Sequence, residues 1–242
     1  FIGKSKVPIM NSAGGTEVSG SILHCCLHRP FKVGSFNAPI PGMSADILNH
    51  DGTKTKTNDL GELVMRKSSI GLTKSLWNDD KRYIDNYWNV IKNFWVHGDL
   101  ASRDEDGHWF LHGRSDDTIK VSGKRIGPSE LESAIIKTGK IKEVAAVGIP
   151  DEKKGSRIIL SVVPLNAKDP DMKEEYLNNL IIKDLGKSFK PDKIIFVKDL
   201  PKTRNMKIMR RVIKSCLVNQ DPGDISTLLN PESVEEIKQH GI

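Results

Sequence analysis

Hydrophobic residues between Val18 and Leu111 occur in short runs that alternate with polar residues and end at Gly, Pro or Asn. Four of these runs predict β-strands, at 18–27, 44–52, 61–68 and 93–102. Residues 77–91 carry apolar side chains at helical spacing and predict a short helix. The pair Asp106-Gly107, between two strand candidates, is a strong signal for a β-hairpin. This part of the chain is therefore expected to be rich in β-structure.

After Arg114 the pattern changes to helices and strands in alternation. The expected elements are a hairpin at 118–126, a helix at 127–140, strands at 143–150 and 156–165, a helix at 171–186, a strand at 192–201 and a helix at 209–217. This alternation predicts a compact α+β domain that follows the β-rich region.

Local signals refine two of these elements. Ser122-Gly123 lies where the hairpin must turn. In the helix that follows, Ser129 and Glu132 have the spacing of a capping box, and Gly139 supplies a stop signal. Glu132 is therefore interpreted as a capping residue rather than as part of a site.

The composition of the chain mainly excludes classes of protein and site. The 242 residues are 37% hydrophobic and 28% charged, which is ordinary for a globular protein. No run of eighteen apolar residues occurs, so no membrane span is expected. The three cysteines, two of them adjacent (Cys25 and Cys26), have neither a disulfide pattern nor metal-ligand spacing, which favours a reducing, cytoplasmic location. Because the chain starts at Phe1 without a leader sequence, we expect it to begin inside a longer protein.

Positive charge is concentrated between Lys183 and Lys214. This stretch contains eleven Lys or Arg residues against three acidic residues. Such a surface is either solvated or faces an anionic partner. Aromatic residues are nearly absent from it, so nucleic acid is not the expected partner. A phosphorylated small molecule remains compatible with the charge.

Two short motifs place oxygen and guanidinium groups where a nucleotide could use them. Thr16 and Glu17 pair a hydroxyl donor with a hard oxygen ligand. Asp99 and Arg114 flank the predicted hairpin, and a carboxylate at a turn can accept hydrogen bonds from both hydroxyls of a ribose. Taken alone, Thr16 and Glu17 are better explained as part of a surface strand, and Asp99 and Arg114 as the charged rim of a plain hairpin.

Five ordered segments together resemble the adenylate-forming superfamily, and in particular acyl-CoA synthetases of the acetyl-CoA synthetase type. They are NSAGGTEVSG, VHGDLASRDEDGHWFLHGR, GRSDDTIKVSGKRIGPSELES, PKTRNMKIMRRVIK and GDISTLLNPESVEEI. The resemblance covers nearly the whole chain from Asn11 onward. The third segment is the most specific, and the last separates this type from peptide-synthetase adenylation domains.

The resemblance implies a role for each matching residue of the first two segments. Thr16 would contact the α-phosphate of ATP, and Glu17 would help to hold magnesium. Asp99 and Arg114 would bind the ribose.

The third and fourth segments imply roles in the second region. Asp116 would be the hinge between two orientations of a small mobile domain, Gly123 would let the pantetheine of CoA pass, and Arg125 would reach the phosphates. Lys207 would be the catalytic lysine of adenylation. Asn205 and Met206 stand where the family has Ser-Gly, so the loop is expected to be less permissive.

The resemblance therefore implies the C-terminal portion of such an enzyme. Residues 1–115 would be the β-rich end of the large domain, and 116–242 the small α+β lid domain. The reaction would convert a short- or medium-chain carboxylic acid, ATP and CoA into acyl-CoA and AMP. ATP/AMP, CoA and Mg would be the cofactors, and the acid and the N-terminal domain of the same enzyme the partners, without nucleic acid or membrane. The family's phosphate-binding loop has no counterpart here, so this chain alone is expected to bind ATP weakly.

Two further expectations concern substrate and activity. Ala13 and Gly14 stand where acetate-specific members have tryptophans, which predicts an acid larger than acetate. The alternative to an enzyme is a noncatalytic binding or regulatory module derived from one, which the changes at Ala13, Asn205 and Met206 would favour.

Overall fold

A computed structural model describes residues 6–167, 169 and 172–241. The chain divides into two compact units, residues 1–115 and 116–242. The first is built from β-strands with short helical turns, and the second from three strands and four α-helices beside a small hairpin. The α+β prediction is confirmed.

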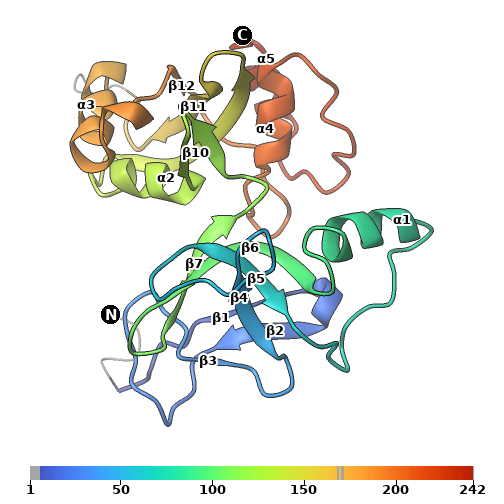
Figure 1. Ribbon diagram of the computed structural model, residues 1–242. Helices are drawn as coiled ribbons and strands as arrows, with labels where there is room; N and C mark the ends of the chain where they lie inside the picture. The colour runs from blue at the N-terminus through green and yellow to red at the C-terminus, as the bar shows by residue number, and fades with distance from the viewer. Residues whose placement is uncertain (1–5, 168, 170–171, 242) are drawn as a thin grey trace. The chain divides into compact units, whose positions relative to one another are not determined.

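Two sheets form the first unit, drawn in blue to green in Figure 1. One sheet has the order β1-β2-β3 and the other β4-β5-β6-β7. Their bounds are β1 Ser12–Gly15, β2 Gly20–His24, β3 Ala38–Pro39, β4 Ala45–Leu48, β5 Gly61–Met65, β6 Trp95–Arg103 and β7 Trp109–Arg114. Large apolar side chains from both sheets, among them Leu23, Leu63 and Trp95, share one buried cluster. The strands predicted from alternation are confirmed, and so is the hairpin at Asp106-Gly107.

The helix predicted at 77–91 is also present. It begins as α1 (Asp80–Tyr83) and continues as a π-helical turn, η3 (Ile84–Trp88). Asp79 caps its start by accepting a hydrogen bond from the Arg82 N–H at 3.2 Å. Tyr83 and Tyr87 pack inward from this segment, so it covers the apolar cluster of the first unit.

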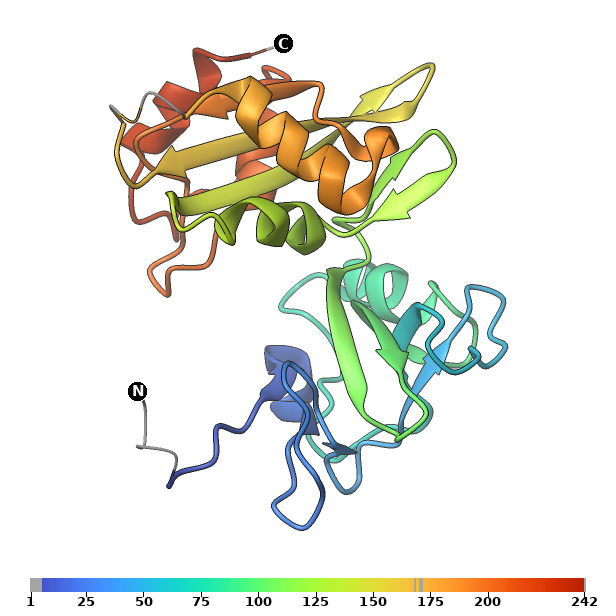
Figure 2. The same cartoon turned by 90° about the vertical axis from the view of Figure 1, so that its left-hand side faces the viewer.

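The second unit is layered around a three-stranded sheet. β10 (Ile141–Asp151) pairs antiparallel with β11 (Gly155–Pro164), which pairs parallel with β12 (Lys193–Phe196). α2 (Pro128–Ile136) and α3 (Glu174–Leu185) cover one face, while α4 (Arg210–Leu217) and α5 (Glu232–Lys238) cover the other (Figure 1). Figure 2 shows α3 crossing in front of the strands.

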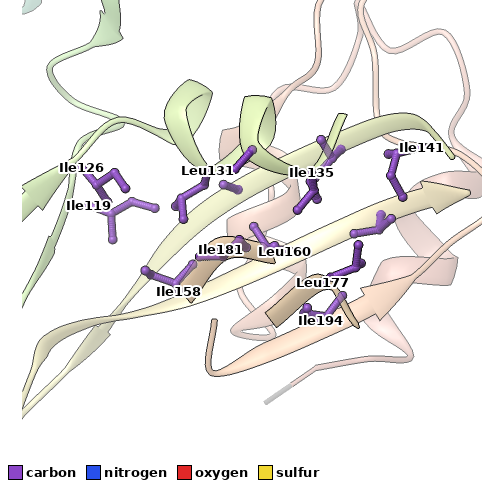
Figure 3. Packing of buried hydrophobic residues seen from close by; sticks show 14 of the residues in the cluster. Ile119, Ile126, Leu131, Ile135, Ile141, Ile158, Leu160, Leu177, Ile181 and Ile194 are labelled. Carbon is purple, nitrogen blue, oxygen red and sulfur yellow. The ribbon is translucent and has the colours of Figure 1, made fainter. Parts of the chain in front are cut away.

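Alternation along the strands explains why both faces are buried. In β10, Val144 and Ala146 enter the cluster beneath α2 and α3, whereas Ala145 and Val147 enter the cluster beneath α4 and α5. The first of these clusters is shown in Figure 3. Since every second side chain serves a different helical layer, the sheet is the common wall of two cores.

The start of α2 differs from the prediction. The helix begins at Pro128, and Glu130 rather than Glu132 closes the cap, because its Oε1 accepts from the Gly127 N–H at 3.1 Å. The capping box at Ser129 and Glu132 is therefore wrong. Glu132 is buried instead, and its role is described below.

Helix α5 has no counterpart in the sequence prediction. Its seven residues bury Val234 and Ile237, which are three positions apart and face the sheet. This spacing is a helical signal, but the run is too short to stand out from a loop. Among the described residues, no helix is long and apolar enough to cross a lipid bilayer.

A close backbone contact fixes the pairing of β1 with β2. A Cβ on Gly14 would lie 2.0 Å from the Gly20 carbonyl oxygen, where the register shifts. Gly20 itself has open space around its missing Cβ. Gly14 is thus required by the approach of the two strands.

We predict that Gly14→Ala lowers the free energy of unfolding of the first unit by about 1–3 kcal/mol, because the added methyl overlaps main-chain atoms. Gly20→Ala is the matched control and should change it by less than about 0.5 kcal/mol. All four tryptophans lie in this unit, so urea unfolding followed by tryptophan fluorescence measures it. Equal midpoints for the two variants would contradict the prediction.

Candidate functional site

Asp99 and Arg114 are brought together by the β6–β7 hairpin, where they are register partners. An Arg114 guanidinium nitrogen (Nη1) lies 3.7 Å from Asp99 Oδ1 and donates to the His97 carbonyl oxygen at 3.0 Å. The Asp99 side chain is 16% exposed, so it is largely enclosed but still reaches solvent. The pairing places an acceptor and a donor side by side.

Gly98 makes room for this arrangement. Its φ is +83°, and a Cβ there would lie 2.6 Å from Arg114 Nη2. The irregular register of β6 against β7 follows immediately, between Asp99 and Ala101. The guanidinium therefore crosses the strand where no side chain stands in the way.

Thr16 and Glu17 lie in a short 3₁₀ turn, η2 (Thr16–Val18), that directly follows β1. The Thr16 side chain is exposed. Glu17 is partly buried, and its Oε1 accepts a hydrogen bond from the Tyr87 hydroxyl at 3.1 Å. Burial, followed by the neighbouring Glu17 carboxylate, raises the pKa of Tyr87, so this phenol stays a donor at neutral pH.

Three aromatic rings connect the two carboxylates within the first unit. Tyr87 stacks on Trp95 with ring centroids 5.3 Å apart, and Trp95 contacts the His97 ring at 5.6 Å. Tyr87 bonds Glu17 at one end, and His97 Nε2 lies 3.2 Å from Asp99 Oδ2 at the other. Neither Tyr87 nor His97 was predicted as part of a site, because nothing in the sequence places either residue beside a carboxylate.

In the second unit, β8 (Ile119–Val121) and β9 (Lys124–Ile126) form the predicted hairpin. Ser122 and Gly123 have φ values of +50° and +81°, as a tight two-residue turn requires. Nothing lies within 4 Å of the missing Cβ of Gly123, and Arg125 is exposed. Both residues are thus accessible at the surface of this unit.

Lys207 projects from a tight turn between two bridged residues, Lys202 and Ile208. The Thr203 N–H donates to the Lys207 carbonyl at 2.9 Å, and the Met206 N–H donates to the Thr203 carbonyl at 2.8 Å. Lys207 is exposed, so its ammonium is held on a fixed base but is free to reach outward. Met206 occupies the left-handed region with φ +62°. The backbone keeps a conformation suited to Gly at this position, although the side chain is Met.

The residues around this turn form three partly buried ion pairs that the sequence did not reveal, one through Arg210 and two through Lys202. Arg210 donates two hydrogen bonds of 2.8 Å to the Glu132 carboxylate, which also accepts from the Ala146 N–H at 2.9 Å. Lys202, 3% exposed, contacts Glu143 at 2.7 Å and Asp199 at 2.6 Å. These pairs fix both ends of the segment that carries Lys207.

Arg210 also faces a cavity of about 300 Å³ next to the proposed hinge. Asp116, Asp117, Arg211 and Lys214 line it too, and Arg210 lies 3.9 Å from Asp117. The basic stretch that the sequence shows is therefore not one uniform solvated face, because some of its cations are paired inside the unit.

A second acidic cluster lies on the β6–β7 turn of the first unit. Asp104, Asp106 and His108 place potential ligand atoms within 4.8 Å of one another. The Lys32 ammonium already contacts Asp104 at 2.5 Å and Asp106 at 3.3 Å. A side-chain cation thus balances these carboxylates, and the cluster fits a turn-stabilising ion pair.

We predict that Met206→Gly stabilises the second unit by about 0.5–1 kcal/mol. The left-handed conformation costs a residue with a Cβ about 1–2 kcal/mol, and part of the gain is offset by the greater freedom of Gly in the unfolded chain. Asn205→Gly is the control, because Asn205 is outside the left-handed region and Gly there only adds entropy cost. Unfolding followed by the helix signal in circular dichroism should rank Met206→Gly above wild type and Asn205→Gly below it. The reverse order of stabilities would contradict the conclusion that Met206 is strained in the left-handed conformation.

We predict that Lys202→Met lowers the stability of the second unit by roughly 2–3 kcal/mol at neutral pH, since it leaves two carboxylates without their cation. Burial opposes the charge on Lys202, but the hydrogen bonds that its ammonium donates to Asp199 and Glu143 outweigh this effect and raise the pKa of the ammonium. Burial likewise opposes the charge on Asp199, yet Lys202 and the other donors lower the pKa of this carboxyl below 3.8.

The sign of the pH effect follows from these shifts. The contribution of Asp199 is complete above its ordinary pKa and is lost as the pH falls through the lowered value. That of Lys202 is lost as the pH rises through its raised pKa. The difference between wild type and Lys202→Met should therefore shrink below pH 3.8. Lys198→Met, at an exposed lysine, is the control. A stability difference between wild type and Lys202→Met that does not depend on pH would contradict the stabilising role of the ion pair.

Comparisons with known proteins bear on the whole chain. Residues 130–207 match the family described as the AMP-binding enzyme C-terminal domain. The chain is 38% identical over 245 residues to an acetyl-coenzyme A synthetase of Methanothrix soehngenii, covering 98% of this chain and 36% of that protein. An acetyl-coenzyme A synthetase of Helicobacter pylori strain P12 is 38% identical over 248 residues, with 98% and 37% covered.

Solved structures show the same fold. An acetoacetyl-CoA synthetase from Streptomyces lividans superposes with a TM-score of 0.83 at 23% identity, over 95% of this chain and 35% of that one. ATP-bound MatB from Rhodopseudomonas palustris gives 0.74 at 23% identity, over 86% and 40%. The chain spans between a third and two-fifths of the length of these proteins.

Proposed function

Because this chain belongs to the AMP-forming acyl-CoA synthetases as a C-terminal part of that enzyme type, we propose that it supplies the ribose contact, the hinge and the adenylation lysine of such an enzyme. The complete enzyme would first join a carboxylic acid to ATP. A carboxylate oxygen attacks the α-phosphorus, and the bond to pyrophosphate breaks. The CoA thiol then attacks the acyl carbon, and AMP leaves.

The first unit would bind the nucleotide. Asp99 accepts from the ribose hydroxyls while the neighbouring Arg114 donates to the same sugar. Thr16, exposed at the end of β1, donates to the α-phosphate.

Glu17 fits a magnesium ion, because its carboxylate supplies hard oxygen ligands. The Tyr87 hydroxyl bonds Oε1 and so orients the carboxylate, and Oε2 does not take part in that bond. Magnesium would neutralise the phosphate charge when bound. The acidic oxygen and the neighbouring hydroxyl of Thr16 are what this chain contributes to that site.

The second unit would serve both steps. Lys207 places its ammonium beside the carboxylate and α-phosphate, where negative charge accumulates as the adenylate forms. Asp116, at the boundary between the two units, would be the pivot for the change to thioester formation, with Gly123 in the pantetheine channel and Arg125 near the phosphates.

The fixed turn that carries Lys207 is the observation that supports this function most strongly. The buried pairs at Lys202 and Arg210 and the left-handed Met206 hold an exposed lysine on a defined base, although Ser-Gly is replaced. A degenerated binding module would have no need of such a geometry.

We predict that Lys207→Ala in the complete enzyme lowers the rate of adenylate formation by about 10²–10³-fold, the usual effect of removing one group that stabilises transition-state charge. Thioester formation from supplied acyl-AMP and CoA should be largely unchanged. ATP–pyrophosphate exchange measures the first step, and release of AMP measures the second. Lys198→Ala, another exposed lysine of the same unit, is the control.

Two outcomes would contradict this assignment. Full exchange activity in Lys207→Ala would remove the lysine from the mechanism. No activity of the wild-type enzyme in either step, with AMP still bound, would favour the noncatalytic module.

We also propose that the acid is larger than acetate. Ala13 is small and partly buried beside the cluster that contains Trp95, so the room for a longer acyl chain would lie at this position. Each methylene buried in the space of an absent indole would gain about 0.8 kcal/mol, or roughly fourfold in kcat/KM. In an ATP–pyrophosphate exchange series, propionate, butyrate and branched acids should exceed acetate. A series in which acetate is the best acid would exclude this substrate class.

A further inference from the structure

His97 lies on β6 two residues before Asp99, and its imidazole is nearly enclosed, with 8% of the side chain exposed. Its Nε2 lies 3.2 Å from Asp99 Oδ2. This is an ion-pair distance. A carboxylate can only accept a hydrogen bond, so any bond between the two groups is donated by a protonated Nε2 of His97 to Asp99.

The ring cannot easily turn away from this bond. One side faces Trp95, with ring centroids 5.6 Å apart, and Trp95 is itself 1% exposed beneath Tyr87. The Cε1 edge of the ring lies 3.2 Å from the position of a Cβ on Gly15. Rotation would move the ring into Trp95 or into the backbone that leads to Thr16.

The other ring nitrogen is buried and has no hydrogen-bond partner within residues 6–167, 169 and 172–241. Glu17 Oε2 lies 3.0 Å from the same Gly15 Cβ position that the ring edge approaches. One edge of the imidazole therefore approaches the same position as Glu17, while its Nε2 lies 3.2 Å from Asp99. A buried nitrogen without a partner is costly unless the rest of the ring is needed where it is.

We propose that His97 is a positioning residue for the ribose contact, in which its Nε2–H holds the Asp99 carboxylate in the orientation that accepts the sugar hydroxyls. Each carboxylate oxygen has two acceptor sites, so Asp99 can accept from His97 and still accept from the nucleoside. Arg114, 3.7 Å from Oδ1, fixes the second oxygen from the other side. This inference rests on the proposed role of Asp99.

The test compares the binding of AMP and of 2′,3′-dideoxy-AMP to the complete enzyme by titration calorimetry. Wild type should bind AMP more tightly, because the dideoxy ligand lacks the hydroxyls that Asp99 accepts from. In His97→Ala the ratio of the two dissociation constants should fall roughly tenfold, as expected for a lost hydrogen bond to a charged group. His97→Gln should retain most of the ratio, since its amide nitrogen reaches about as far as Nε2, whereas His97→Asn should not.

His112→Ala is the matched control, because this histidine lies on the adjacent β7 and pairs with Ser102 Oγ at 2.9 Å. Its ratio should equal that of wild type. If His97→Ala does not fold, the Gln and Asn pair alone decides the test.

The outcomes separate the two proposals. Equal affinity of wild type for both ligands would overturn the ribose role of Asp99. Discrimination by wild type that persists in both His97→Ala and His97→Asn, or that is lost equally in His112→Ala, would overturn the positioning role of His97.

Discussion

The crossing of Arg114 over Gly98 is the contact on which the candidate nucleotide site of the first unit depends. A guanidinium can lie across a β-strand only where no Cβ projects, and residue 98 adopts a φ of +83° that favours Gly. The crossing aligns Arg114 with Asp99, bonds the His97 carbonyl and ends β7 one residue before the boundary between the units. Any side chain at Gly98 would displace these groups together.

The second unit uses the same principle, with exposed functional groups carried by turns that a buried framework fixes. The β10–β11 hairpin forms the wall between two apolar cores, and its Ala146 N–H donates to Glu132. Glu132 in turn holds Arg210, three residues after Lys207. The movement available to Lys207, the proposed adenylation lysine, is thus confined to its side chain, while the backbone on either side is anchored in ion pairs and sheet.

Much of the fold followed from the sequence because periodicity and turn residues are local signals. Most strands of both units, the turn at Ser122-Gly123 and three of the four described helices of the second unit were predicted from them, whereas the short strands β1 and β3 were not. The start of α2 was wrong, since two acidic residues near a helix N-terminus compete for one cap, and only burial decides between them. Helix α5 was missed because seven residues give too few turns for a periodic signal.

Sequence motifs identified residues of the candidate site, but they did not identify the residues that pack against and orient them. Asp99 and Arg114 could be paired from the hairpin, yet the aromatic rings that orient the carboxylates come from segments far apart in the chain. Contacts such as Tyr87 with Glu17 and Lys202 with Glu143 depend on tertiary packing, which no local pattern encodes.

The most direct test of the assignment to AMP-forming acyl-CoA synthetases follows the oxygen of the acid. The complete enzyme is incubated with ATP, CoA and a carboxylic acid labelled with heavy oxygen in its carboxylate, and the nucleotide product is examined by mass spectrometry. Adenylate chemistry transfers a labelled oxygen from the acid to AMP, so labelled AMP and unlabelled pyrophosphate are the expected products. ADP together with labelled inorganic phosphate would show an acyl-phosphate route and would contradict the assignment.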